Sequence, residues 1–340
     1  MKAIYLTKYG KSSDAFEIRE CSKPEPGPNS VLIKVETFGL NFADVMARNG
    51  LYRAAPPLPC ILGYEVVGVI ERRGEGVEQF ENGQKVVAFT RFGGYAEYAV
   101  TDYRAVAPLP EDYDICEAAA LPTQYGTAYH CACDLANIRQ GEHVLIHAAA
   151  GGVGIALTQL AKLKGCIVYG TVSSDEKMQL LEKQGVDYPI NYSETDYAKA
   201  ILKIRGNKKM DAIFNPIGGK FFKTDRKILG YGGRLIGFGA SDRLGRRKNI
   251  FSKYKLLLDF GFIHPVGLLV SSTTVGGANM LKLADHKPEI LRRCLENVTD
   301  LAIKGKIKPY VGGRFGPEEL SKAHELLENR KSLGKLVIRW

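Results

Sequence analysis

The residues with the clearest chemical potential form a glycine cluster after a short apolar run. The run spans His143 to Ala148, and Gly151-Gly152-Val153-Gly154 follows it closely. Apolar residues then recur at a helical spacing that stops at Gly165. A strand, a glycine turn and a helix in this order present free backbone N–H groups to a pyrophosphate. The sequence therefore predicts a dinucleotide-binding loop.

Two glycines of this loop have separate tasks. Gly152 lets a phosphate approach the backbone, and Gly154 lets the helix pack close to the sheet. The usual first glycine is replaced by Ala149, so the strict G-x-G-x-x-G fingerprint is not met and the prediction rests on the strand-to-helix context. The predicted phosphate-binding residues are Ala150, Gly151, Gly152, Val153 and Gly154.

The end of the next predicted strand, Ile167–Val172, indicates which dinucleotide is bound. An acidic residue there holds the ribose 2′-OH of NAD, whereas hydrogen-bond donors suit the 2′-phosphate of NADP. Ser173 and Ser174 supply hydroxyls, and Lys177 follows one helical turn later. Asp175 leaves NAD open as an alternative, because its carboxylate could bind the ribose or simply favour the helix N-terminus. The pattern favours NADP(H).

Strands and helices continue to alternate beyond this loop. Further strands are predicted at Asp187–Ile190, Asp211–Phe214 and Arg234–Phe238. This alternation predicts a doubly wound parallel sheet with right-handed crossovers, a Rossmann fold. The first third of the chain instead carries short strands with Pro and Gly turns, such as Val31–Val35 and Val66–Ile70, and predicts a β-barrel domain.

The last part of the chain predicts helices at Pro288–Lys304 and Phe315–Lys331 and a closing strand at Leu336–Ile338. We expect this tail to return to the first domain. The predicted domains are 1–121, completed by 287–340, for the β domain, and 122–286 for the dinucleotide-binding domain.

Length and composition agree with a two-domain globular protein. The chain has 340 residues, of which 45% are hydrophobic and 25% charged. Seven scattered cysteines and the lack of a secretory signal in Met1–Gly10 favour a cytoplasmic location. The longest charge-free stretch, Phe260–Leu281, is interrupted by His264, Pro265 and four glycines, so it is not expected to span a membrane. It could form interface strands.

The net charge of +10 is concentrated in one segment. Between Lys199 and Lys255 there are sixteen basic and three acidic residues. Such a patch could attract nucleic acid or an acidic membrane, but no nucleic-acid-binding motif accompanies it, which favours a solvated face. Its densest part is Arg243, Arg246, Arg247 and Lys248.

Four segments together resemble the medium-chain dehydrogenase/reductase superfamily. They are Asn41–Tyr52, Gly63–Val69, Ala148–Gly154 and Ala323–Glu328. More narrowly the chain resembles the zinc-independent, zeta-crystallin-like quinone oxidoreductases, nearest the branch of vesicle amine transport protein homologues. The resemblance covers nearly the whole chain. It implies a GroES-like catalytic domain built from both chain ends, an inserted Rossmann domain and a homodimer.

The zinc ligands of the more distantly similar alcohol dehydrogenases are missing. Asn41 stands where those enzymes have a cysteine, and Tyr64 stands where they have a histidine. The third ligand falls near Pro122-Thr123, which contains neither residue type. Catalytic zinc needs about three protein ligands, so no metal is predicted.

Two residues are candidates for the chemistry through the resemblance. Asn41 would lie near the nicotinamide, where its amide orients the ring or binds a substrate oxygen, and Tyr52 would contact cofactor or substrate and relay a proton. The alternatives are a turn residue for Asn41 and half-buried packing for Tyr52. We expect Asp44 to cap the following helix and Glu65 to be a buried acid paired with a nearby base.

The resemblance adds further cofactor contacts outside the glycine loop. Thr127 would approach the phosphate or nicotinamide, and Tyr192 would flank the 2′-phosphate with Lys177. Phe238, Gly239 and Ala240 would line the nicotinamide side, with a core aromatic as the alternative for Phe238. His147 is expected to be a satisfied core histidine rather than a base.

These features together predict an NADPH-dependent quinone oxidoreductase, of the class EC 1.6.5, that transfers hydride to a quinone or an activated enone without a metal. The alternative from a different class is a nucleotide-binding scaffold with little turnover, which would use the basic surface to bind membrane or RNA.

Overall fold

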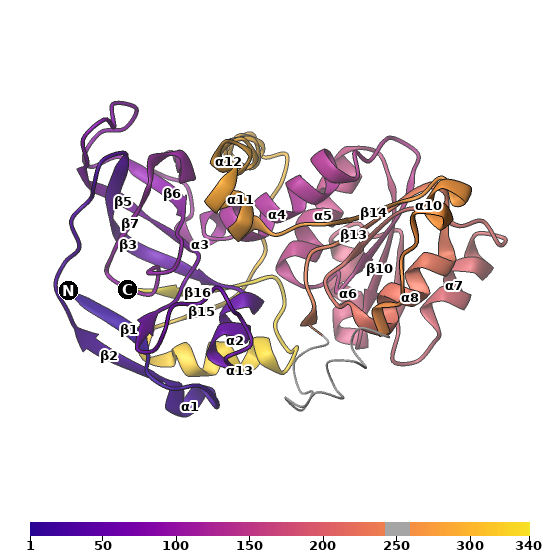
Figure 1. Cartoon of the computed structure of the whole chain (residues 1–340), viewed down its shortest axis with the longest axis horizontal. Coiled ribbons are helices and arrows are strands. Elements are labelled where there is room, and N and C mark those ends of the chain that lie inside the picture. The colour runs from indigo at the N-terminus through magenta and orange to yellow at the C-terminus, as the bar shows by residue number, and fades with distance from the viewer. Residues whose placement is uncertain (242–258) are drawn as a thin grey trace. The chain divides into compact units, whose positions relative to one another are not determined.

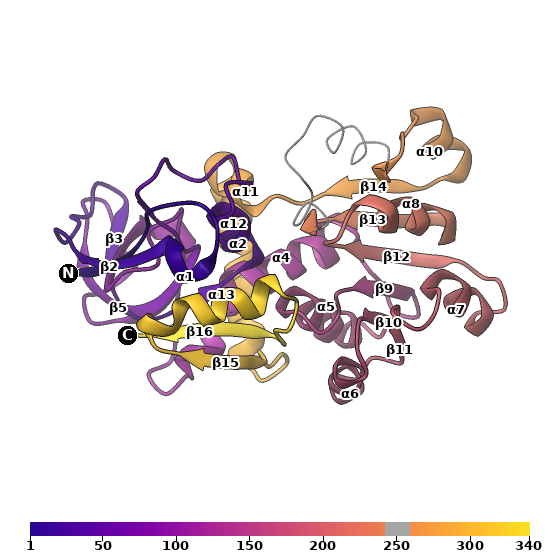
Figure 2. The same cartoon turned by 90° about the horizontal axis from the view of Figure 1, so that it is seen from below.

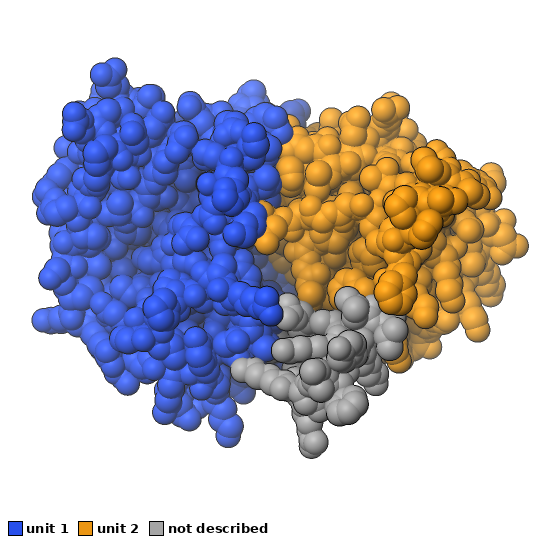
Figure 3. Space-filling model, viewed as in Figure 1, with its two compact units in different colours: residues 1–126, 280–340 blue, residues 127–279 orange. Residues whose placement is uncertain are grey.

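The computed structural model describes residues 1–241 and 259–340, which form two compact units. Unit 1 comprises Met1–Gly126 and Met280–Trp340, and unit 2 comprises Thr127–Asn279 (Figure 3). Arg243, Arg246, Arg247 and Lys248 lie outside the described residues. The assignment of catalysis and dinucleotide binding to separate domains remains a prediction.

Unit 2 is built on a six-stranded parallel sheet. Its strand order is β11-β10-β9-β12-β13-β14, and every neighbouring pair is parallel. Figure 2 shows this order as a stack of labelled strands. The predicted doubly wound Rossmann sheet is therefore confirmed. The strands are β9 (His143–His147), β10 (Ile167–Val172), β11 (Tyr188–Asn191), β12 (Met210–Asn215), β13 (Leu229–Gly237) and β14 (Thr274–Gly277).

Helices cover both faces of this sheet (Figure 1). On one face, apolar residues of α7 and α8 pack against Leu145, Tyr169 and Ile213. On the other face Gly170 makes room for Leu181 of α6, since successive residues of β10 point to opposite sides. The helices of unit 2 are α5 (Gly152–Leu163), α6 (Asp175–Lys183), α7 (Tyr197–Ile204), α8 (Gly219–Ile228) and α10 (Pro265–Ser271).

Unit 1 contains two sheets. One has the order β15-β16-β3-β5-β6-β8, with β7 also paired to β3, and the other has the order β2-β1-β4. The strands are β1 (Lys2–Leu6), β2 (Phe16–Glu20), β3 (Ser30–Leu40), β4 (Cys60–Ile61), β5 (Glu65–Arg73), β6 (Lys85–Phe89), β7 (Tyr98–Asp102), β8 (Val106–Pro108), β15 (Val311–Phe315) and β16 (Lys335–Arg339).

The C-terminal segment returns to this unit through β16. This strand pairs antiparallel with β3, where Leu336 lies opposite Leu40. The helices of unit 1 are α1 (Ser12–Ala15), α2 (Phe42–Arg48), α3 (Ile115–Ala118), α11 (Met280–His286), α12 (Pro288–Ile303) and α13 (Leu320–Glu328); α4 (Gly126–Tyr129) joins the two units in sequence. Among the described residues no helix is long and apolar enough to cross a membrane.

The predicted helix at 315–331 begins too early. Phe315 ends strand β15 and pairs with Ile338, and α13 starts only at Leu320. The residue before a proline is disfavoured in helical conformation, so Pro317 keeps Gly316 extended. Sequence pattern alone did not reveal β15, because its pairing with β16 is a tertiary contact.

Candidate functional site

The glycine loop of unit 2 connects β9 directly to α5. Gly151 is the N-cap of α5, and Ala148 takes up a left-handed backbone conformation with a φ of 51°. A Cβ on Gly154 would lie 2.4 Å from Ala148 O and 2.6 Å from Ala149 Cα. No side chain fits there, so α5 packs against the loop as closely as a glycine allows. Its first N–H groups lie next to the end of β9.

This loop lies where ligands bind in doubly wound sheets. The strand order reverses at β9, which has β10 on one side and β12 on the other. In open α/β sheets the carboxyl ends of strands at such a switch point hold the ligand. Ser173, Tyr192 and Phe238 each follow directly after the last residue of β10, β11 and β13. The structure thus brings these predicted cofactor residues to one edge of the sheet.

The residues after β10 include two hydroxyl donors, Ser173 and Ser174, and one acid, Asp175, that bonds to β11. Ser174 is the N-cap residue of α6, and its side chain makes no capping hydrogen bond among the described residues. Asp175 Oδ1 accepts a hydrogen bond of 3.0 Å from Asn191 Nδ2 at the end of β11. Lys177 is half-buried in the first turns of the same helix. Asp175 is the acidic residue that left NAD open as an alternative, and its carboxylate is bonded to Asn191.

Tyr192 lies on the chain just beyond Asn191. Its N–H donates to Val172 O at 2.9 Å, and its ring meets that of Phe221 edge-on, with centroids 5.5 Å apart. Phe238 is half-buried. It is therefore not a fully enclosed core aromatic, which was the alternative to a residue that lines the nicotinamide side. Gly239 is exposed and Ala240 is half-buried. Thr127 is buried in α4.

His147 is a satisfied core histidine, as expected. Its Nδ1 lies 2.8 Å from Thr171 Oγ1, and its Nε2 lies 2.8 Å from Asp225 Oδ1. Asp225 also accepts hydrogen bonds from Asn215 Nδ2 and Tyr197 Oη. This network ties α7 and α8 to the sheet. Sequence reasoning missed Asp225, although a single acid among the basic residues of α8 was a usable signal.

Unit 1 contains a separate buried polar cluster around Asn41. Asn41 Nδ2 donates to Glu65 Oε1 at 2.7 Å, and Lys335 Nζ donates to Asn41 Oδ1 at 3.1 Å. Lys335 and Glu65 form an ion pair, and both side chains are fully buried. Glu65 Oε2 also accepts from Thr123 N at 2.9 Å. The expected buried acid is therefore confirmed, and its base, which the sequence left unidentified, is Lys335.

Asp44 has the structural role that was expected of it. Its Oδ2 accepts from Asn41 N at 2.9 Å at the start of α2, and its Oδ1 accepts from Gly63 N at 3.3 Å. Burial raises the pKa of the Asp44 carboxyl from 3.8 to about 7. The carboxyl holds two backbone segments of unit 1 rather than facing solvent.

Tyr52 is half-buried beside Tyr64. The two rings meet edge-on with centroids 6.1 Å apart. Burial raises the pKa of the Tyr52 phenol above its usual value of 10, and the nearby Asp44 adds to this. Tyr52 therefore keeps its proton at neutral pH and can act as a hydrogen-bond donor. Burial also raises the pKa of Tyr64 far above its usual value.

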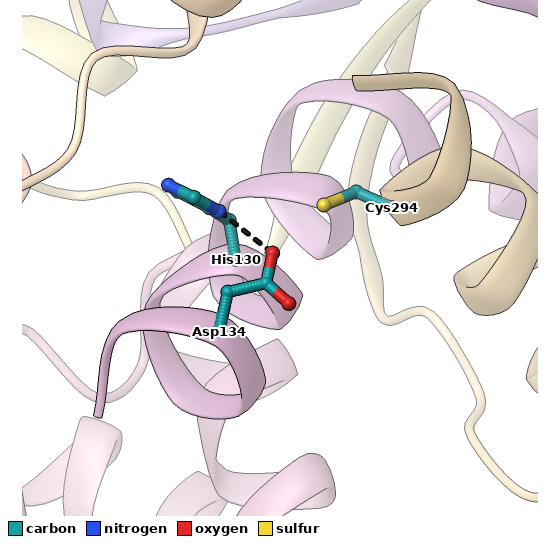
Figure 4. Close-up of side chains that lie close together, drawn as sticks. All are labelled: His130, Asp134 and Cys294. Carbon is teal, nitrogen blue, oxygen red and sulfur yellow. Dashed lines mark hydrogen bonds and ion pairs between the residues drawn. The ribbon is translucent and has the colours of Figure 1, made fainter. Parts of the chain in front are cut away.

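A second histidine of unit 2, His130, also bonds an acidic side chain. His130 Nδ1 lies 2.8 Å from Asp134 Oδ2 on the π-helical segment His130–Leu135 (Figure 4). The third residue drawn, Cys294, belongs to α12 of unit 1. His130 and Asp134 thus bond each other within one helical segment.

A GroES-like unit and a Rossmann unit with a glycine loop define the class of medium-chain dehydrogenases. Residues 27–111 match the family described as alcohol dehydrogenase GroES-like domain, and residues 152–282 match the family described as zinc-binding dehydrogenase. The chain is 35% identical to a synaptic vesicle membrane protein VAT-1 homolog of Danio rerio, over 99% of this chain and 69% of the relative.

Two further proteins support the same placement. A quinone oxidoreductase of Rattus norvegicus is 31% identical over 99% of this chain and 97% of its own length. The crystal structure of Escherichia coli quinone oxidoreductase complexed with NADPH matches with a TM-score of 0.87 and 27% identity, covering both chains fully. This chain belongs to the medium-chain dehydrogenase/reductase superfamily of oxidoreductases, in the zeta-crystallin-like group near the VAT-1 branch. The resemblance seen in the sequence is thereby confirmed.

Proposed function

We propose that this protein is an NADPH-dependent, zinc-independent oxidoreductase that transfers hydride to a quinone or an activated enone. The observation that carries the proposal is the loop between β9 and α5. Gly154 leaves no room for a Cβ against Ala148 and Ala149, and the free N–H groups of α5 lie at the switch point of the sheet. This cradle fits the pyrophosphate of a dinucleotide.

The preference for NADP(H) over NAD(H) rests on three residues. Ser173, Ser174 and Lys177 would hold the 2′-phosphate, because they donate hydrogen bonds or carry positive charge. Asp175 would oppose the phosphate, but its carboxylate is held by Asn191. The Escherichia coli relative was crystallised with NADPH, which supports the same cofactor here.

On the acceptor side we propose Asn41 and Tyr52. The nicotinamide supplies a hydride when bound. Asn41 Nδ2 carries two hydrogens, and only one of them has an acceptor, Glu65, among the described residues. The other would donate to a carbonyl oxygen of an acceptor that reaches this buried side chain. The protonated Tyr52 would donate a second hydrogen bond or relay a proton.

The direct test is a titration with NADPH and with NADH, followed by a panel of quinones and enones under anaerobic conditions. We expect NADPH to bind at least tenfold more tightly and to be oxidised by at least one acceptor in protein without stoichiometric metal. Stoichiometric zinc would refute the metal-free mechanism. Equal binding of both dinucleotides would refute the assignment of the 2′-phosphate site.

We also propose a homodimer formed through the edge of the sheet in unit 2. Strand β14 is the last strand on its side of the sheet. Beside it, Phe262, Val266, Leu269 and Val270 expose 76%, 56%, 79% and 78% of their surface. Such contiguous apolar exposure marks association surfaces.

Sedimentation analysis of Leu269→Glu tests the dimer. We expect the wild type to sediment as a dimer and the variant as a monomer. Leu163→Glu, at a half-exposed leucine of α5, is the matched control and should remain dimeric. A monomeric wild type would refute the interface.

We also propose that the protein is located in the cytoplasm.

The scaffold alternative has one observation in its favour. Several lysines of α7 and α8 are exposed, and none forms an ion pair among the described residues; they are Lys199, Lys203, Lys220, Lys223 and Lys227. Binding of RNA or anionic vesicles that weakens steeply with salt, together with negligible NADPH oxidation, would favour this alternative over the enzyme.

A further inference from the structure

The ion pair between Lys335 and Glu65 is completely enclosed in unit 1. Both side chains have no exposed surface. Gly39 makes room for them, since a Cβ there would lie 2.2 Å from Lys335 Cε and 2.4 Å from Glu65 Oε1. Three segments far apart in sequence therefore contribute to this pair: β3, the start of β5 and the start of β16.

Stability does not explain this pair well. Taking two charges out of water is costly, and apolar residues of similar volume are often equally stable or better. Burial lowers the pKa of the Lys335 ammonium, and the carboxylate of Glu65 opposes that shift. Burial of the pair is therefore weak evidence for a stabilising role, and its contacts with a third side chain bear on what it does.

The third partner of the pair is the side chain of Asn41. Its amide oxygen accepts from Lys335, and its amide nitrogen donates to Glu65. Turning the amide over would place its oxygen against the carboxylate and its NH₂ group against the ammonium. Both contacts would be repulsive. The two charges therefore allow only one of the two orientations of the amide, and the same network assigns its oxygen and nitrogen atoms.

We propose that Lys335 and Glu65 are positioning residues that lock the Asn41 amide, so that its second Nδ2 hydrogen is presented to the carbonyl oxygen of the acceptor. This inference rests on the proposed function and names its substrate class, a carbonyl compound such as a quinone or enone. An orientation fixed before binding avoids the cost of ordering the group during the reaction. Asn41 is the group that touches the acceptor, and the ion pair acts through it.

The kinetic test is a double-mutant cycle on Lys335 and Asn41. We expect Lys335→Met to slow hydride transfer in a single turnover by about 10- to 100-fold, the size of effect that misplacing a reacting group has. In the Asn41→Ala background the same change should slow it less than about twofold, because the locked amide is already gone. Equal slowing in both backgrounds would overturn the proposal.

Two further variants guard against a purely structural effect. Lys335→Met combined with Glu65→Gln removes both charges, so that no unpaired charge is left buried if the single variant does not fold. Lys85→Met is the matched control, because Lys85 is a buried lysine of the same unit whose Nζ donates only to the backbone carbonyls of Glu111 and Tyr113. It should lose stability and keep the wild-type rate of hydride transfer.

A measurement without turnover tests the lock itself. In protein labelled with ¹⁵N at asparagine, the side-chain signal of Asn41 is the one lost in Asn41→Ala. We expect its hydrogens to exchange slowly with solvent in the wild type and in Lys85→Met, and at least tenfold faster in the Lys335→Met and Glu65→Gln variant. Unchanged exchange in that variant would overturn the lock.

The two proposals fail in different ways. If no acceptor oxidises NADPH, or if Asn41→Ala keeps the wild-type rate, the proposed function of Asn41 is wrong, whatever the exchange experiment shows. If Asn41→Ala is slow but Lys335→Met is not, the proposed function stands and the positioning role of the ion pair is wrong.

Discussion

Replacing Gly154 by alanine gives the most direct test of the dinucleotide loop. The added Cβ would lie 2.4 Å from Ala148 O, whereas real Cβ atoms stay at least 3.0 Å from other heavy atoms. The atoms in contact belong to the backbone, so no flexible side chain can move away. The start of α5 or the loop must therefore shift by about 0.6 Å, the difference between these two distances.

The magnitude follows from two opposing effects on the free energy of unfolding. Overpacking of this kind costs about 1–3 kcal/mol, and alanine gains about 1 kcal/mol over glycine in a helix. The net loss is then about 0–2 kcal/mol, so the variant should fold. The shifted N–H groups are those that would hold the pyrophosphate, and one hydrogen bond to a charged group contributes about 1.5–3 kcal/mol. We therefore expect NADPH to bind roughly 10- to 100-fold more weakly.

Calorimetric titration with NADPH and unfolding in urea measure the two quantities. Gly267→Ala in α10 is the control, because a Cβ there meets nothing within 4 Å; it should bind NADPH like the wild type. A folded Gly154→Ala variant that binds NADPH with wild-type affinity would refute the assignment of the loop as the cofactor cradle.

Three further predictions concern charge. Lys177→Glu should weaken NADPH sharply and spare NADH in the same titration, whereas Lys183→Glu at the other end of α6 should change neither; equal loss of both dinucleotides would contradict the specificity argument. Burial lowers the pKa of His324 from 6.5 to about 3, so the contribution of this residue to stability is complete above pH 6.5 and falls by about 1.4 kcal/mol per pH unit between pH 6.5 and about 3; His324→Phe should remove this loss in urea unfolding, and a variant with the wild-type pH profile would contradict it. Burial raises the pKa of Asp44 to about 7, so its contribution is present below pH 3.8 and is lost as the pH rises through 7; Asp44→Asn should remove that loss, and an unchanged pH profile would contradict it.

Much of unit 2 could be predicted from the local pattern of apolar residues and glycines. Strand β10 runs over Ile167–Val172, as predicted, because a short apolar run between turn residues has few other ways to be buried. The glycine spacing at the start of α5 also predicted the loop correctly, because only a glycine can approach a backbone this closely. His147 was also assigned correctly, because a histidine within a buried strand must find partners inside the fold.

The sequence alone determined the features that depend on residues close together in the chain. These are the phosphate loop, the alternation of strands and helices, and the lack of zinc-ligand residue types at Asn41 and Tyr64. Only the tertiary structure decided which residues meet across long separations. Lys335 reaches Asn41 over 294 residues, and it does so because β16 pairs with β3. Asn191 holds Asp175 because β10 and β11 are neighbours. Such contacts depend on strand order and register, which no local pattern of residues encodes.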